Sequence, residues 1–134
     1  QIGRWTKQYR LAQTDDLPEV ERLIEWLPRT MPEQRRTAIV HGDYRIDNMI
    51  FAEDAPQIRA VLDWELSTLG DPMADFSHLM MNWETPPNGG AGVKGLTGPD
   101  SGIPTMEKLI DRYCAATGQP GVGNLNWYFA FSQF

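Results

Sequence analysis

The chain has 134 residues, 41% of them apolar, which is the size of one ordinary domain built around a single core. Its 12 basic and 18 acidic residues give a net charge of −6, and this balance argues against nucleic acid as a partner because no basic surface is available to neutralise phosphates. There is no run of about 18 apolar residues and no charged-then-apolar leader, so we expect no membrane span and a location in the cytoplasm or an intracellular organelle.

The first regular spacing of apolar residues follows a mixed, basic stretch at residues 1–13. Thr14 or Asp15 is a candidate N-cap, and Pro18 stands early in the turn that follows. Apolar residues then recur at spacings of three and four, which predicts one stripe of a helix that ends at or near Pro28. The stripe consists of Leu17, Val20, Ile24 and Leu27.

Three short β-prone runs come next, at residues 37–40, 49–51 and 58–62. A polar loop at residues 41–48 joins the first two runs, and the third delivers Asp63 at its end. We expect the three strands to lie beside one another, which would bring their polar ends together.

A second helix is predicted to open at Asp71 and Pro72, a cap followed by a proline at the first helical position, and to end near Trp83. Its apolar face consists of Met73, Phe76, Leu79 and Met80. Residues 84–104 then hold six glycines and four prolines, a density that indicates a surface loop between two helices.

Residues 105–117 form the next predicted helix, and Gly118 is its expected C-cap. Cys114, the one cysteine of the chain, lies within this pattern, so an internal disulfide is excluded and a buried structural thiol is predicted.

The two ends of the sequence suggest an excised segment. It begins at Gln1 rather than methionine, and it stops inside an aromatic run at residues 127–134 without a turn or capping signal. We therefore expect residues 1–134 to be part of one domain, truncated at both ends.

The residues with the clearest chemistry lie at 41–48, followed 15 residues after Asn48 by Asp63. Phosphoryl transfer needs one aspartate to align the attacking hydroxyl or to accept its proton, and oxygen ligands to hold magnesium across the phosphates. Asp43 is the candidate for the aligning or proton-accepting aspartate, and Asn48 and Asp63 are the candidate magnesium ligands.

This pattern resembles the aminoglycoside phosphotransferase and choline kinase-like family, whose hallmark is H-G-D-x-x-x-x-N followed by a strand that ends in D-W or D-F. The resemblance covers residues 38–83 closely and implies ATP and Mg²⁺ as cofactors. It implies an α+β, mostly helical fold, the C-terminal lobe of a protein kinase-like fold, with a short β-hairpin that carries the catalytic loop. By this resemblance Asp43 is catalytic, Asn48 and Asp63 bind metal and nucleotide, and Asp75 supports the loop.

Arg45 lies two residues after Asp43, where protein kinases often place a lysine that faces the transferred phosphate. An arginine fork suits the equatorial phosphate oxygens. Many aminoglycoside phosphotransferases have a histidine here, so Arg45 departs from the family pattern. A contact to an anionic substrate and a solvated surface position are the alternatives.

Three further residues are assigned supporting roles beside Asp75, and one histidine is assigned none. His41 resembles the histidine that packs the family's loop, and Asp47 is expected to hold the loop rather than to touch substrate. Glu65 either makes a water-mediated metal contact or closes the loop. His78 is interpreted as a packing histidine without a chemical role.

Residues 90–95 fit G-x-G-x-x-G, a pattern that binds phosphates between a strand and a helix or in a hairpin over a nucleotide. In kinases that hairpin precedes the catalytic loop, whereas this stretch follows it. We interpret it as a loop without a nucleotide role, near the acceptor substrate at most.

Residues 45–48 and 62–72 look similar to the kinase-like domains associated with acyl-CoA dehydrogenases. That branch implies phosphorylation of a hydroxyacyl-CoA or hydroxy acid, and a fused or associated acyl-CoA dehydrogenase as partner. Net charge does not decide the acceptor, since a polycationic aminoglycoside suits an acidic cleft and a CoA thioester needs local cations. Loosely motivated candidates are Arg4, Lys7, Arg45 and Lys94.

Nothing before Gln1 supplies the small N-terminal kinase lobe with its phosphate-gripping lysine. We therefore expect an ATP-dependent small-molecule kinase that is active only in its intact form. One alternative is a non-catalytic pseudokinase module that binds or regulates. Another is a metal-dependent hydrolase built on His41, Asp43 and Asp63, which lacks a second histidine in the site.

Overall fold

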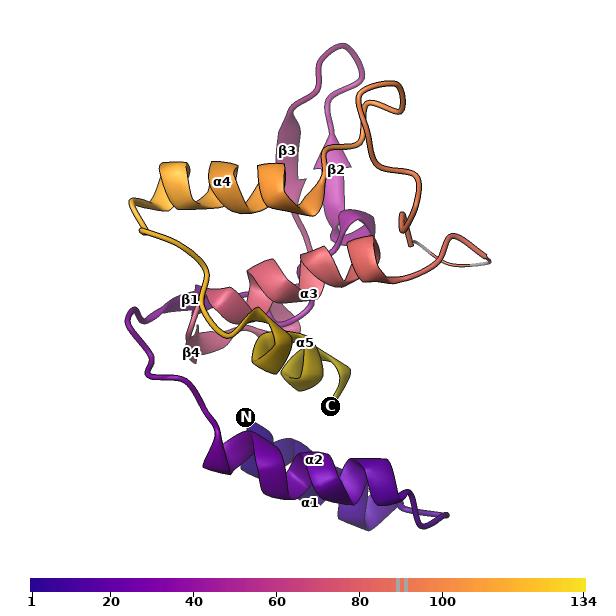
Figure 1. Cartoon of the computed structure of the whole chain (residues 1–134), viewed down its shortest axis with the longest axis vertical. Helices are drawn as coiled ribbons and strands as arrows, with labels where there is room; N and C mark the ends of the chain where they lie inside the picture. The colour runs from indigo at the N-terminus through magenta and orange to yellow at the C-terminus, as the bar shows by residue number, and fades with distance from the viewer. Residues whose placement is uncertain (89, 91) are drawn as a thin grey trace.

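The computed structural model describes residues 1–88, 90 and 92–134. Within them the fold is α+β and mostly helical, with five α-helices and four short strands (Figure 1). The helices are α1 (Ile2–Ala12), α2 (Pro18–Arg29), α3 (Met73–Glu84), α4 (Met106–Thr117) and α5 (Leu125–Gln133). The strands are β1 (Ala38–Val40), β2 (Met49–Phe51), β3 (Ile58–Val61) and β4 (Thr68–Gly70). Two 3₁₀ turns, η1 (Ile46–Asn48) and η2 (Trp64–Leu66), adjoin the strands.

The strands form two separate antiparallel pairs, so the expectation of three strands side by side was wrong. β1 pairs with β4 in the register Ala38↔Gly70, and β2 pairs with β3 in the register Met49↔Val61. Strand β4 went unpredicted because it ends in a glycine directly before Asp71 and Pro72, which indicated a helix start, whereas β1 and β2, equally short, are runs of β-prone residues. The loop at 41–48 therefore bridges the two pairs instead of lying inside a hairpin. The β2–β3 hairpin follows that loop directly.

The core lies between α3 and α5 and receives side chains from α2 and α4. Its buried members are Leu27, Met73, Phe76, Met80, Trp127 and Tyr128. Trp127 fixes α5 to α2, because its indole Nε1 donates a hydrogen bond of 3.1 Å to the Leu27 carbonyl. The Tyr113 ring of α4 stacks on Phe76 at 3.9 Å between centroids. This aromatic packing gives α3 a rigid position.

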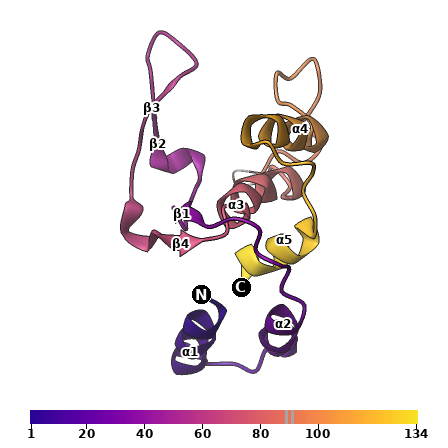
Figure 2. The same ribbon diagram turned by 90° about the vertical axis from the view of Figure 1, so that its left-hand side faces the viewer.

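Helix α1 was not predicted, since residues 1–13 looked mixed and basic. It packs beside α2, and Arg10 pairs with Glu21 across the two helices. Helix α2 begins at Pro18 with Leu17 at the N-cap and runs through Pro28 to Arg29. Neither Thr14 nor Asp15 caps it. Figures 1 and 2 place this helix pair at one end of the molecule and the β2–β3 hairpin at the other.

The other helix ends match the sequence more closely. Asp71 Oδ1 accepts a 3.0 Å hydrogen bond from the Met73 amide, although α3 begins only after Pro72. Gly118 caps α4 with φ = 69°, as predicted. Cys114 is half-buried, less enclosed than predicted. None of the helices in the described ranges is long and apolar enough to cross a membrane.

Candidate active site

The loop at 41–48 is fixed to helix α3 by one carboxylate. Asp75, in the first turn of α3, accepts hydrogen bonds from two successive backbone amides, His41 N to Oδ2 at 2.7 Å and Gly42 N to Oδ1 at 2.9 Å. Both carboxylate oxygens are therefore used to hold loop backbone, and charge-assisted bonds of this kind are stronger than neutral ones. These are the contacts expected of Asp75 from the sequence.

His41 is almost fully buried and uses both ring nitrogens within the site. Nε2 lies 2.7 Å from the Leu62 carbonyl, which can only accept, so Nε2 carries the proton. Nδ1 lies 3.2 Å from the Asp43 amide, which can only donate, so Nδ1 accepts. The ring is thus neutral and ties the loop to the end of β3. It has no nitrogen left for a metal, which removes the basis for a hydrolase site on His41.

Gly42 is required by the shape of the loop. Its φ is +89°, a conformation that residues with a side chain rarely adopt. A Cβ here would lie 2.8 Å from the Leu66 carbonyl oxygen, well inside van der Waals contact. The loop and η2 therefore approach as closely as they do because this position has no side chain.

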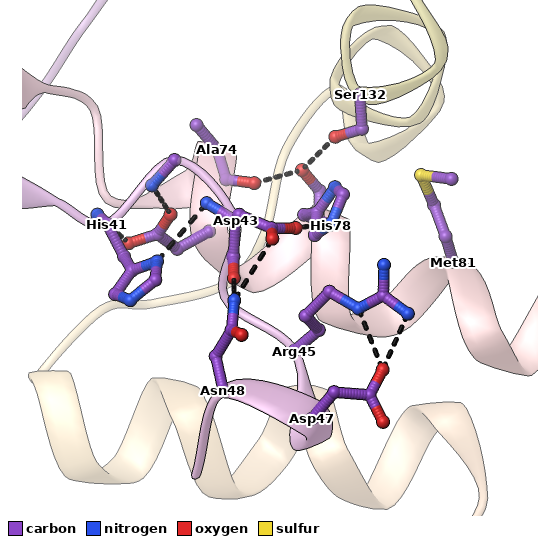
Figure 3. A network of polar contacts seen from close by, with 12 residues as sticks. His41, Asp43, Arg45, Asp47, Asn48, Ala74, His78, Met81 and Ser132 are labelled. Atoms are coloured by element: carbon purple, nitrogen blue, oxygen red, sulfur yellow. Dashed lines mark hydrogen bonds and ion pairs between the residues drawn. The ribbon is translucent and has the colours of Figure 1, made fainter. Parts of the chain in front are cut away.

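Asp43 lies at the centre of the loop with its carboxylate held from two sides (Figure 3). Asn48 Nδ2 donates to Asp43 Oδ2 at 3.0 Å and to the Asp43 backbone carbonyl at 2.9 Å. On the other side, His78 Nε2 of α3 lies 3.3 Å from Asp43 Oδ1. About a third of each side chain in the Asp43–His78 pair stays accessible, with 30% exposure for both. The carboxylate is oriented yet open to a small molecule.

Asn48 and Asp63 come together at the base of the β2–β3 hairpin. The Leu62 amide donates to the Asn48 carbonyl at 2.8 Å, which sets Asp63 next to the loop. Asp63 adopts the left-handed conformation with φ = 62° and ψ = 56°, and strained backbone of this kind gathers at functional sites. The Trp64 indole secures this turn with a 2.8 Å hydrogen bond to the Val61 carbonyl.

The donor set at this base fits magnesium. The Asn48 amide uses its NH₂ for Asp43, so its oxygen remains available as a ligand, and the Asp63 carboxylate is exposed. Amide and carboxylate oxygens are the ligands that this hard cation prefers. Within the described ranges no group of three His, Cys, Asp or Glu side chains is close enough to hold a metal. A site here would depend on the Asn48 oxygen and on substrate phosphates.

Arg45 pairs with Asp47 on the outer side of the loop. Its Nε and Nη2 donate to Asp47 Oδ2 at 3.0 and 2.6 Å, and both side chains are about half exposed. Asp47 thereby holds the arginine fork near the loop surface, below Asp43 in Figure 3. Glu65 lies on η2 with an exposed side chain.

His78 is the site residue that the sequence interpretation missed. It contacts the Asp43 carboxylate, so its assignment as a packing histidine was wrong. The available signal was its spacing from Asp75, because residues three apart on a helix share a face. If Asp75 faces the catalytic loop, His78 must face it too.

A hollow of about 270 Å³ opens beside Asp43. Helix α1 contributes Arg4 and Trp5 to its wall, α3 contributes His78, and α5 contributes Phe131. The wall mixes apolar side chains such as Trp5 and Phe131 with the Arg4 guanidinium and the carboxylates of Asp43 and Asp75. The Arg4 guanidinium lies 5.2 Å from the centre of the Trp5 ring.

The glycine-rich pattern at 90–95 is separate from these contacts. Ala91 lies outside the described residues. Among the others, Val93 N donates to the Asn82 carbonyl at 2.7 Å, and Lys94 pairs with Glu84 at 3.1 Å. This stretch thus folds back on the end of α3, after the catalytic loop in the chain.

Comparison with known proteins shows which protein family this chain matches. A model of the phosphotransferase enzyme family matches residues 1–122. Mouse acyl-CoA dehydrogenase family member 10 is 47% identical over the whole chain, and human acyl-CoA dehydrogenase family member 11 is 38% identical over the whole chain. The chain spans only 13% and 17% of those two proteins.

The match extends to a crystal structure. A protein from Ralstonia eutropha JMP134, assigned as an aminoglycoside phosphotransferase, superimposes with a TM-score of 0.89 at 46% sequence identity. The alignment covers 98% of this chain and 40% of that one. The helices, the two strand pairs and the loop between them are therefore shared with that structure.

Proposed function

Because this chain belongs to the phosphotransferase enzyme family, we propose that it forms the catalytic lobe of an ATP-dependent kinase for a hydroxyl of a small molecule. The observation that carries the proposal is the Asp43 carboxylate, oriented by Asn48 and His78 and still accessible.

In the proposed reaction the acceptor hydroxyl oxygen attacks the γ-phosphorus of ATP. A new P–O bond forms, the bond from the γ-phosphorus to the ADP oxygen breaks, and the hydroxyl proton passes to the Asp43 carboxylate. Positioned proton transfer of this kind contributes about 10²–10⁴-fold to rate. Magnesium held by the Asn48 amide oxygen and the Asp63 carboxylate would neutralise charge on the phosphates.

We propose that Arg45 stabilises the transferred phosphoryl group. Asp47 holds the Arg45 guanidinium close to the loop. Because this ion pair is exposed, Arg45 would lose little free energy by releasing the Asp47 carboxylate and binding a phosphate instead. His41 and Asp75 would keep the loop in place during this exchange, since the His41 ring binds the Leu62 carbonyl and Asp75 accepts from a loop amide. Glu65 is proposed to support the Asp63 turn.

For the acceptor we propose a hydroxyacyl-CoA or a hydroxy acid. The support is the similarity to acyl-CoA dehydrogenase family members and the hollow beside Asp43, whose wall holds apolar side chains and Arg4. An apolar acyl chain would pack against Trp5 and Phe131, and an anionic group would bind Arg4. The alternative is a cationic acceptor of the aminoglycoside or choline kind, which the Ralstonia protein's assignment and the net charge of −6 favour.

The remaining parts of the enzyme are proposed to come from the rest of the parent protein. An N-terminal lobe would complete the ATP site, and an acyl-CoA dehydrogenase is the proposed fused or associated partner. We therefore expect residues 1–134 alone to bind nucleotide weakly and to turn over poorly. Robust ATP turnover by this segment would contradict that expectation.

The test is phosphate transfer from ATP by the intact parent protein to a panel of hydroxyacyl-CoAs, hydroxy acids, choline and aminoglycosides. We expect a phosphorylated hydroxyacyl-CoA or hydroxy acid, and a raised KM for that acceptor in Arg4→Ala. Transfer to a cationic acceptor alone would contradict the proposed acceptor class but would support the proposed kinase activity. Nucleotide binding without transfer to any acceptor would favour the pseudokinase module.

A further inference from the structure

We propose that His78 is a positioning residue for Asp43, so that helix α3 holds the catalytic loop at two points. This inference rests on the proposed phosphotransfer at Asp43. Asp75 holds the loop backbone through the amides of His41 and Gly42. Three residues further along the same helix face, His78 holds the Asp43 side chain through Oδ1.

The side chain of Asp43 needs such a second contact. A carboxylate rotates easily about its last bond, because torsions between sp³ and sp² carbons have broad minima. The Asn48 amide fixes Oδ2 at 3.0 Å, but Asn48 is also a proposed metal ligand and its position will depend on what it binds. His78 is not a proposed metal ligand, and its Nε2 lies 3.3 Å from Oδ1 on the opposite side, where it limits rotation of the carboxylate.

The helix that carries His78 is rigidly seated. The opposite face of α3 is buried, with Phe76, Ser77 and Met80 at 9%, 0% and 0% exposure. Ser77 Oγ is hydrogen-bonded to the Ala74 carbonyl and lies 3.2 Å from Ser132 Oγ of α5, which joins the two helices (Figure 3). A side chain on such a helix is held more accurately than one on a loop, and small misplacements of a catalytic group cost up to about 10²-fold in rate.

The test compares His78→Ala and His78→Gln in the intact parent protein. We expect kcat to fall about 10-fold to 100-fold in His78→Ala with KM for ATP unchanged. Glutamine can donate a hydrogen bond at similar reach, so His78→Gln should recover much of kcat. Glu84→Gln, on the same helix but paired with Lys94, is the control and should keep wild-type kcat.

A double-mutant cycle separates positioning from a general structural role. If His78 acts through Asp43, His78→Ala should lower kcat little further in an Asp43→Asn background. Additive losses would overturn the proposal, as would wild-type kcat in His78→Ala or no recovery in His78→Gln.

The Asp43 side chain itself gives a readout that needs no turnover. Crystal structures of the intact wild type and of His78→Ala should show the carboxylate rotated in the variant, and an unchanged rotamer would overturn the proposal. If the wild type transfers phosphate to no acceptor, the proposed function fails, and this structural comparison still decides the role of His78.

Discussion

The catalytic loop at 41–48 and the connection at 84–104 are both irregular, yet they are held in different ways. The loop is bound by side chains distant in sequence, with Asp75 and His41 making contacts across 34 and 21 residues. In the described part of the connection, most hydrogen bonds join nearer residues, such as Ser101 Oγ to the Gly98 carbonyl, and one long-range contact, Trp83 Nε1 to the Pro104 carbonyl at 2.8 Å, holds its end. Irregular backbone can thus be as firmly placed as a helix when carboxylates and ring nitrogens bind it.

The largest expected loss of stability follows removal of the carboxylate that holds the loop. Asp75→Ala leaves the amides of His41 and Gly42 without their acceptor, and we expect the loop to lose about 2–4 kcal/mol of local stability. Hydrogen exchange of peptides over residues 38–48 in the intact protein measures this loss. Asp75→Asn, which keeps one carbonyl oxygen, should lose about half as much. Unchanged exchange in Asp75→Ala would show that the loop does not depend on α3.

Gly42→Ala should cause the next largest loss of folding stability, about 2–3 kcal/mol. The alanine adds backbone strain at positive φ and a clash with a carbonyl oxygen. The added Cβ would lie 2.8 Å from the Leu66 oxygen, so either the loop or η2 has to move. The melting transition of this domain in the intact protein should fall accordingly. If Gly42→Ala is as stable as the wild type, the loop and η2 can move apart without a loss of folding free energy.

Gly95→Ala is the matched change in the connection. Its φ is +81°, close to that of Gly42, but nothing lies within 4 Å of an added Cβ. Only the conformational strain of about 1 kcal/mol remains. The difference between the two alanine variants, read from the same melting experiment, isolates the close approach of loop and η2. Equal losses would assign the whole effect to backbone conformation.

The smallest effect is expected for Lys94→Ala. The ion pair with Glu84 is more than half exposed on both sides, and surface pairs of this kind contribute about 0–1 kcal/mol. The melting transition should move little, and raising the salt concentration should not enlarge the difference. A loss as large as that of Gly42→Ala would mean that the connection is anchored as firmly as the loop.

The residues of the candidate site could be selected from the sequence because their spacing is recognisable, and the chemistry assigned to them stays a prediction. Asp43, Asn48 and Asp63 lie at intervals that phosphoryl transfer imposes on a loop and the hairpin after it. Asp75 could be predicted as well, since its place follows from a recognisable helix start. Helices α2, α3 and α4 followed from their apolar stripes, which reflect burial on one face.

The missed features depend on contacts distant in sequence. β4 is defined by its pairing with β1, and its residues Thr68–Gly70 are not a β-prone run of the kind that revealed β1 and β2. Helix α1 gains its place from packing on α2 rather than from a clear stripe of its own. His78 is a different case, because its spacing of three residues from Asp75 already placed both side chains on one helix face.

The central claim is that the α3-bound loop presents Asp43 for phosphoryl transfer, and Asp43→Asn tests it most directly. The measurement is the rate of transfer from ATP to the best acceptor in the intact parent protein, with magnesium, for wild type and variant. We predict a fall of about 10²–10⁴-fold in kcat, equivalent to roughly 3–5 kcal/mol of transition-state stabilisation, with nucleotide binding retained. Undiminished transfer by Asp43→Asn would contradict the account.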